Sequence, residues 1–369
     1  MSVGAGVNER LAALTAAGTS VWLDQIRRSL ITSGELERLE RELSLRGVTS
    51  NPAIFEKAIL GSTDYDEQVA ELAEQGMAAR AIYDEIAILD VQLACDVLRG
   101  VWEEADHGDG FVSLEVEPSV AHDTDLTIEQ AKDFWGRVDR PNLMIKIPGT
   151  TEGVPAIEES IAAGINVNIT LLFSVESYTN IAEAYIRGME RRHEAGESLD
   201  IHSVASFFVS RVDTEADRRL EEIGRKDLQG RLAVDNAKLA YQHYLEAFAG
   251  PRWEALAAAG ARPQRCLWAS TSTKNPAYRD VLYVEELIGP DTVNTMPFET
   301  IDAFQDHGEV RDTLTEGLDE ARALLRALAD AGVDYDDVTD TLEREGVEKF
   351  SASYASLLEG IDAKRAALV

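Results

Sequence analysis

A lysine lies in the middle of an apolar, β-rich run, 143–147, in which Lys146 is the only charged residue. Burying an ammonium group is costly. Burial therefore favours the neutral amine, which attacks carbonyl groups and can form a Schiff base. Lys146 is a candidate nucleophile on this argument. Two other interpretations stay open at this point: a lysine paired with a buried carboxylate, and a lysine on the outer, helix-facing side of its strand.

Other polar side chains occupy or end neighbouring strand candidates. They are Asp24, Glu115, Asn168 and Thr170. Carboxylates can move protons, and an amide or a hydroxyl can hold a water molecule, so this set suits the formation and breakdown of a carbinolamine. Glu115 could instead be an ordinary ion-paired carboxylate, and Glu117 should share its face of the strand. Asp24 could also cap a helix.

Asn51 follows the second strand candidate in the run Thr49-Ser50-Asn51-Pro52. Proline restricts the preceding residue to an extended backbone. The run therefore indicates a strand-to-helix turn, and the alternative is an amide directed at substrate hydroxyl groups.

Cationic side chains follow the sixth and seventh strand candidates. Arg211 comes just after the sixth, and the run Ser270-Thr-Ser-Thr-Lys274 follows the seventh. Barrel enzymes often bind phosphate near their last strands. Arginine binds phosphate through two parallel hydrogen bonds, whereas lysine acts as a point charge. These residues are candidate phosphate ligands, although each taken alone could be an ordinary surface group.

Eight short β-rich runs alternate with amphipathic helical segments. The strand candidates are 20–23, 47–50, 112–116, 143–147, 165–170, 203–208, 266–269 and 293–296. Alternation of this kind predicts a parallel sheet, and eight units predict an α/β fold closed as a (β/α)8 TIM barrel. An open doubly wound sheet would need a glycine-rich turn after its first strand, and residues 24–28 contain no glycine.

Helical periodicity fills both long gaps between strands, for example over 77–98 and 232–248. The residues after the last strand are also helical in pattern. We therefore predict one domain over 1–369, with the barrel strands at about 18–300. The gaps hold helical insertions, and residues 301–369 form a C-terminal helical extension packed on the barrel.

The composition excludes several classes of function. A net charge of -32 repels nucleic acid and anionic membranes, so neither is an expected partner. The two cysteines, Cys95 and Cys266, are predicted to be buried free thiols, which favours a reducing, cytoplasmic location. The six histidines show no metal-ligand spacing, and neither a GxxxxGK[ST] phosphate loop nor a GxSxG elbow occurs. No metal or cofactor is expected.

Several motifs together resemble the transaldolase family of Schiff-base-forming class I aldolases. They occur in the family's order, from about residue 15 to about residue 300. The motifs are Trp22–Asp24, Val48–Pro52, Leu143–Pro148, Asn166–Ser174 and Ser206–Arg211. Each motif alone is weakly specific, whereas the combination is highly specific.

The resemblance implies a transferase of the pentose phosphate pathway. Such an enzyme moves dihydroxyacetone from sedoheptulose 7-phosphate to glyceraldehyde 3-phosphate, which gives erythrose 4-phosphate and fructose 6-phosphate. Lys146 would be the Schiff-base lysine. Asp24 would take the proton of the C4 hydroxyl, while Glu115 and Thr170 would hold a catalytic water.

The resemblance also implies the substrate contacts. Asn51 and Asn168 would orient the three-carbon unit, and Ser206 and Phe208 would line the pocket. The phosphate ligands would be Arg211 and Ser270. Many members carry a second phosphate-binding arginine after the seventh strand. Here Ser272 lies near that place, so we expect Lys274 to substitute.

Two other functions stay open on the sequence. One is a Schiff-base aldolase that releases free dihydroxyacetone, and the other is a non-catalytic barrel that binds sugar phosphates. The expected partners are sugar-phosphate substrates, and a homodimer is compatible with the sequence.

Overall fold

Eight parallel strands form a closed barrel in the computed structural model, which describes residues 6–368. The strands are β1 (Thr19–Leu23), β2 (Leu45–Val48), β3 (Phe111–Glu115), β4 (Leu143–Pro148), β5 (Val167–Leu172), β6 (Ser203–Phe208), β7 (Arg265–Ala269) and β8 (Thr292–Met296). Each strand pairs with the next one along the chain, and β8 closes the barrel against β1. The predicted (β/α)8 barrel is confirmed.

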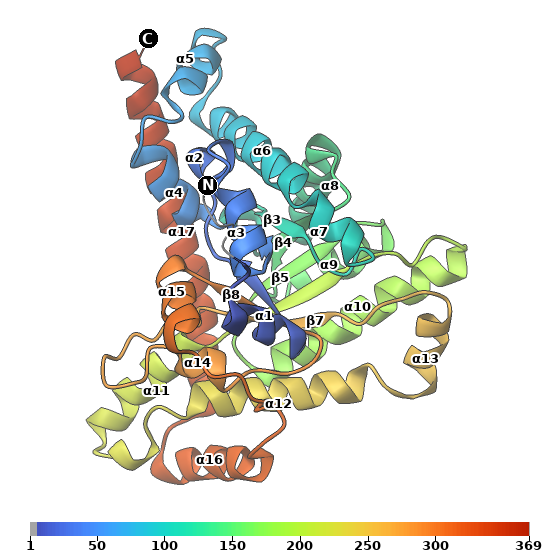
Figure 1. Cartoon of the computed structure of the whole chain (residues 1–369), viewed down its shortest axis with the longest axis vertical. Coiled ribbons are helices and arrows are strands. Elements are labelled where there is room, and N and C mark those ends of the chain that lie inside the picture. The colour runs from blue at the N-terminus through green and yellow to red at the C-terminus, as the bar shows by residue number, and fades with distance from the viewer. Residues whose placement is uncertain (1–5, 369) are drawn as a thin grey trace.

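Helices surround the barrel (Figure 1). They are α1 (Glu9–Ala16), α2 (Arg28–Thr32), α3 (Glu35–Leu43), α4 (Pro52–Leu60), α5 (Asp66–Glu74), α6 (Ala79–Val97), α7 (Arg99–Glu104), α8 (Thr124–Val138), α9 (Gly153–Ala162), α10 (Val175–Ala195), α11 (Ser210–Glu222), α12 (Leu232–Ala247), α13 (Gly250–Ala258), α14 (Leu282–Glu285), α15 (Phe298–His307), α16 (Leu318–Ala331) and α17 (Tyr335–Leu368), with 3-10 turns at η1 (Pro118–Val120) and η2 (Lys226–Leu228). The long gaps hold α4–α7 and α11–α13, so both contain helical insertions as predicted. None of these helices combines the length and the apolar character that a bilayer span requires within residues 6–368.

The strand register explains which side chains point into the barrel. Glu115 of β3 is paired with Lys146 of β4, and Lys146 is paired with Asn168 of β5. Residues in register on adjacent strands lie on the same face of a sheet. These three side chains therefore form one row across three strands.

Two strands are displaced by two residues from their predicted bounds, five others differ by one residue at one or both ends, and β6 has the predicted bounds. β2 begins and ends two residues before the predicted 47–50, and β5 begins and ends two residues after the predicted 165–170. In β2, Gly47 lets the chain pass against the Trp22 ring, where a Cβ atom would lie 2.4 Å from the ring. In β5, the pairing with β6 shifts between Ile169 and Leu172. Both differences depend on packing between strands, which the local sequence pattern does not show.

The C-terminal helix α17 runs along one side of the barrel, next to α4, and ends close to α5 (Figure 1). Near its middle, Gly346 packs against Leu171 at the end of β5, where a Cβ atom would lie 2.8 Å from Leu171 Cδ2. Near its end, Lys364 Nζ donates a hydrogen bond to the Ser62 carbonyl at 2.8 Å. The helix therefore contacts the barrel at the end where the strands finish.

Candidate active site

A cavity of about 330 Å³ opens at the carboxyl ends of the strands. Reactive groups of (β/α)8 enzymes lie at this end. Nine of the eleven site residues predicted from the sequence line it. They are Asp24, Asn51, Lys146, Thr170, Ser206, Phe208, Arg211, Ser270 and Lys274. The other two, Glu115 and Asn168, are buried beneath its lining.

Lys146 reaches the cavity from β4. Its Nζ lies 3.0 Å from Glu115 Oε2 and donates a hydrogen bond to the Ser50 carbonyl at 3.0 Å. The side chain is almost entirely buried, yet it forms part of the cavity lining. The lysine therefore faces inward rather than toward the helices. It is also paired with a buried carboxylate, and this pairing leaves it within reach of a bound molecule.

Glu115 supplies a carboxylate directly beside the amine. Burial raises the pKa of Glu115 above its ordinary value, and the neighbouring Lys146 ammonium opposes that rise. A carboxylate with a raised pKa accepts a proton more readily than an exposed one. Transfer of a proton from the ammonium to Glu115 would leave an uncharged amine at the cavity.

Asp24 lies at the end of β1 and is held by Thr49, whose Oγ1 donates a hydrogen bond to Asp24 Oδ1 at 2.7 Å. Burial raises the pKa of Asp24, while Lys146, the Thr49 hydrogen bond and Arg211 each act in the opposite direction. The alternative role as a helix cap is wrong, because α2 begins at Arg28 and is preceded by Arg27. The carboxylate is positioned instead to exchange a proton with a molecule in the cavity.

Thr170 and Asn168 occupy different depths. The Thr170 hydroxyl is buried at the cavity and has no hydrogen-bond partner within residues 6–368. Asn168 lies deeper: its Nδ2 donates to Ser113 Oγ at 2.9 Å, and its Oδ1 accepts from Ser206 Oγ at 2.7 Å. The structure therefore leaves Thr170 available to a water or substrate and uses Asn168 to hold Ser206 in place.

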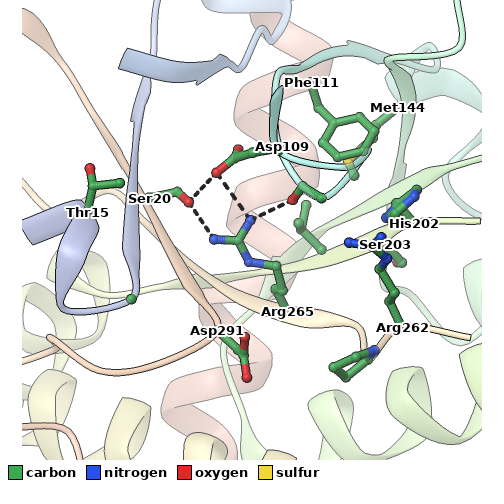
Figure 2. A pocket seen from close by; sticks show the side chains of 15 residues that line it. Thr15, Ser20, Asp109, Phe111, Met144, His202, Ser203, Arg262, Arg265 and Asp291 are labelled. Carbon is green, nitrogen blue, oxygen red and sulfur yellow. Dashed lines mark hydrogen bonds and ion pairs between the residues drawn. The ribbon is translucent and has the colours of Figure 1, made fainter. Parts of the chain in front are cut away.

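A cavity at the other end of the barrel is of similar size, about 340 Å³. In Figure 2 the side chains of Arg265, Asp109 and Ser20 point toward one another. Arg265 Nη2 lies 2.6 Å from Ser20 Oγ, and Asp109 Oδ1 accepts a hydrogen bond from Trp22 Nε1 at 2.8 Å. Arg265, Asp109, Ser20 and Trp22 therefore satisfy one another at this end of the barrel.

The comparison with known proteins agrees with this geometry. A family model described as transaldolase/fructose-6-phosphate aldolase matches residues 21–361. The chain belongs to this family. The transaldolase of Acidothermus cellulolyticus is 54% identical over 359 residues, covering 96% of each chain. The transaldolase of Frankia alni is 51% identical over 94% of this chain and 95% of its own.

A third relative is the transaldolase of Mycobacterium tuberculosis strain H37Rv, which is 52% identical over 95% of this chain and 96% of its own. The resemblance read from the motifs is thereby confirmed, and the chain is an enzyme of the transaldolase type.

Cations gather at one part of the cavity of this transaldolase-family barrel. The Arg211 guanidinium lies 5.0 Å from the centroid of the Phe208 ring, and its Nη1 has no partner within residues 6–368. Lys274 Nζ donates a hydrogen bond to Ser272 Oγ at 2.6 Å, and Ser270 Oγ lies 2.9 Å from Ser210 Oγ. The region offers charge and hydroxyl groups to an anion.

Asn51 fulfils the structural role considered for it. Its Oδ1 accepts a hydrogen bond from the Ile54 amide at 3.0 Å and so caps α4. The residue also lines the cavity, so the capping role does not exclude a contact between its Nδ2 and a bound molecule.

Sequence reasoning missed several lining residues. They are Thr49, Lys57, Thr295, Glu299 and Phe350 among others. Thr49 comes directly after β2, so the rule that found Asp24 could have found it as well, whereas Glu299 lies in the first turn of α15. Lys57 on α4 and Phe350 on α17 belong to helices, and no strand-end rule points to them. No group of His, Cys, Asp and Glu side chains suited to a metal ion occurs in the described part of the chain.

Proposed function

We propose that this enzyme is a transaldolase of the pentose phosphate pathway that carries a dihydroxyacetone unit on Lys146. It would move this unit from sedoheptulose 7-phosphate to glyceraldehyde 3-phosphate. The observation that carries the proposal is the Lys146 amine in the cavity lining, 3.0 Å from the Glu115 carboxylate. Cys95 and Cys266 are buried free thiols, which supports a reducing, cytoplasmic location.

The chemistry begins with attack of the Lys146 amine on the ketose C2 carbonyl. Loss of water from the carbinolamine leaves an iminium ion. We assign the proton transfers of this stage to Glu115 and to a water held by the Thr170 hydroxyl, which is otherwise unpartnered within residues 6–368.

Cleavage follows at the C3–C4 bond. Asp24 takes the proton of the C4 hydroxyl as that bond breaks, and the electron pair of the bond passes into the iminium to give an enamine. The C3 carbon of the enamine then attacks the aldehyde carbon of the acceptor, whose oxygen takes the proton back from Asp24. Hydrolysis of the resulting iminium returns the free amine and the product ketose.

The phosphate of each substrate is assigned to the cationic part of the cavity. Arg211 supplies a fixed guanidinium, Ser270 a hydroxyl, and Lys274 a second charge. Lys57 adds a further cation from α4. We assign Asn51 to the three-carbon unit, and Asn168 acts on that unit through Ser206.

Reduction with borohydride tests the Schiff base. The enzyme is incubated with fructose 6-phosphate and borohydride, digested, and mapped by mass spectrometry. We expect a dihydroxyacetone or hexose phosphate adduct on Lys146 alone. Lys146→Ala should give no adduct and no turnover while its circular dichroism spectrum stays that of the native fold. Labelling at another residue, or none in the wild type, would contradict the mechanism.

An aldolase that releases free dihydroxyacetone is the second candidate, because the matching family model covers fructose-6-phosphate aldolase as well as transaldolase. A coupled assay separates the two. We expect little free triose from fructose 6-phosphate alone and rapid conversion once erythrose 4-phosphate is added. Abundant triose release without an acceptor would establish the aldolase instead.

A further inference from the structure

We propose that Phe350 of α17 closes the cavity beside Lys146 and so determines whether the bound three-carbon unit is transferred to an aldehyde or lost to water. The inference rests on the proposed function, since it requires Lys146 to carry that unit. It adds a specificity-determining residue from the C-terminal helix to a site otherwise built by the barrel strands, their loops and the helices that follow those strands.

Phe350 presents an aromatic ring to the amine. The centroid of the ring lies 5.8 Å from Lys146 Nζ, and the residue is only 6% exposed although it lines the cavity. The nearest partners of the amine are otherwise oxygen atoms, from Glu115 and from the Ser50 carbonyl. The ring therefore supplies an apolar surface at the place where the nitrogen–carbon bond of an adduct would form.

The helix holds Phe350 in place from both sides. One turn before it, Gly346 packs against Leu171, and one turn after it, the Tyr354 ring meets the Tyr83 ring edge-to-face at 5.5 Å. Two residues further on, Ser356 Oγ donates to Glu56 Oε1 of α4 at 2.6 Å. Phe350 is thus a fixed part of the cavity wall.

Leu171 shows that the contact between barrel and helix is tightly constrained. Its backbone is left-handed, with a φ of 61°, which is costly for a bulky residue such as leucine. The same residue follows Thr170 of the cavity and touches Gly346 of α17. A strained backbone of this kind persists only where the surroundings fix it, and here they include the helix that carries Phe350.

The enamine on Lys146 has two fates. In transfer, its nucleophilic carbon forms a bond to the aldehyde carbon of the acceptor, and the aldehyde oxygen takes a proton. In loss, the same carbon takes a proton from water. The iminium formed is then hydrolysed by a second water, which releases dihydroxyacetone and the free amine. Only the second fate needs water at the enamine before an acceptor has arrived, so an apolar wall that excludes water favours transfer.

The test measures a ratio of rates. For Phe350→Ala, free dihydroxyacetone released from fructose 6-phosphate alone is compared with transfer to erythrose 4-phosphate. We expect the ratio of release to transfer to rise about tenfold over the wild type. A purely structural defect lowers both rates together, because it reduces the amount of folded enzyme, and leaves their ratio unchanged.

Leu357→Ala is the matched control. It also truncates a fully buried side chain of α17, but Leu357 does not line the cavity, so its ratio should equal that of the wild type. If Phe350→Ala yields no folded protein, Phe350→Leu replaces it, because leucine stays apolar while it opens part of the wall. Its ratio should rise in the same direction by a smaller factor.

Borohydride trapping distinguishes failure of the inference about Phe350 from failure of the proposed function. An adduct on Lys146 in both the wild type and the Phe350 variant, together with an unchanged ratio, would overturn the inference about Phe350 alone. Absence of any adduct in the wild type would overturn the proposed function itself. An equal rise of the ratio in Leu357→Ala would also refute the inference, because the effect would then come from loosening of α17 in general.

Discussion

Lys146 and Glu115 pair because they lie in register on the neighbouring strands β4 and β3. Both side chains are more than nine-tenths buried, so neither is stabilised much by solvent. Removal of one partner from such a pair leaves the other without compensation, at a cost of about 3–5 kcal/mol when it stays charged. In the intact pair each charge compensates the other, and the raised pKa of Glu115 suits this carboxylate to accept a proton during amine chemistry at a carbonyl.

The cationic part of the cavity leads to a prediction for Lys274. Lys274→Met removes a charge that Ser272 holds at the cavity, while Arg211 remains. A hydrogen bond to a charged group contributes about 1.5–3 kcal/mol. We therefore expect the KM for fructose 6-phosphate to rise about tenfold or more, with kcat changed less than about twofold. Steady-state kinetics measures both.

Inhibition by inorganic phosphate provides the second readout for Lys274. Its inhibition constant should rise in parallel with KM, because the ion uses the same charge. Lys132→Met is the control, since Lys132 is an exposed lysine of α8 that lies outside the cavity. An unchanged KM in Lys274→Met would mean that Arg211 binds the phosphate without help from a lysine at this position.

At the scale of elements, Asp213 joins three helices outside the barrel. The carboxylate of this α11 residue accepts hydrogen bonds from the Ala233 amide of α12 at 2.8 Å and from the Tyr283 hydroxyl of α14 at 2.9 Å. Burial raises the pKa of Asp213 to about 7, and the two hydrogen bonds act in the opposite direction. The junction is therefore sensitive to pH.

The free energy of unfolding should decrease as the pH rises, because Asp213 loses its proton. Its pKa in the folded protein lies above the unfolded value, so its contribution is complete below about pH 4 and is lost as pH rises to about 7. Each pKa unit corresponds to about 1.4 kcal/mol, which bounds the loss at about 4 kcal/mol. Between pH 5 and pH 8, the melting temperature of Asp213→Asn should decrease less than that of the wild type.

The control for Asp213 is Asp125→Asn, which removes the same charge from an exposed position at the start of α8. Its change in melting temperature between pH 5 and pH 8 should follow that of the wild type. If Asp213→Asn and the wild type show equal slopes, the carboxylate titrates outside this range and the prediction is wrong.

At the scale of the whole molecule, the charge of the cavity is opposite to that of the protein. The chain carries a net charge of -32, yet four cationic side chains and two acidic ones line the cavity. The cations are Lys57, Lys146, Arg211 and Lys274. A local excess of positive charge is what a phosphate needs in order to bind against a repulsive global field.

The acidic surface leads to a prediction about salt. Self-repulsion of a large net charge destabilises the folded state, and added salt screens it, with a Debye length of about 10 Å at 0.1 M and about 3 Å at 1 M. We expect the melting temperature to rise between about 0.05 M and 1 M sodium chloride. Surface ion pairs are also screened, but each contributes only about 0–1 kcal/mol.

Choline chloride serves as the control for specific sodium binding. An equal rise with both salts would identify screening as the cause. A melting temperature that stays constant or falls with both salts would show that the ion pairs of the surface already compensate the net charge.

The sequence by itself determined the barrel and most of its site. Short β-rich apolar runs separated by amphipathic helices are local signals, and so is a lysine inside one of these runs, Lys146. The rule that reactive groups lie at strand ends then selected Asp24 and Arg211. The strand pattern alone did not show whether Glu115 or Glu117 is the carboxylate beside the lysine, because alternate residues of a strand share a face. The structure decides it: Glu117 pairs with Arg80 of α6, at 2.5 Å, and Glu115 with the lysine.

Only the tertiary structure decided the remaining features of the cavity. The depth of Asn168 follows from hydrogen bonds to Ser113 and Ser206 on other strands. The presence of Phe350 beside Lys146 follows from the path of α17 across the barrel end. Contacts of this kind join segments far apart in the chain, and they depend on how whole elements pack. No local pattern of residue types encodes that packing, so a single sequence could name the amine but not the ring that covers it.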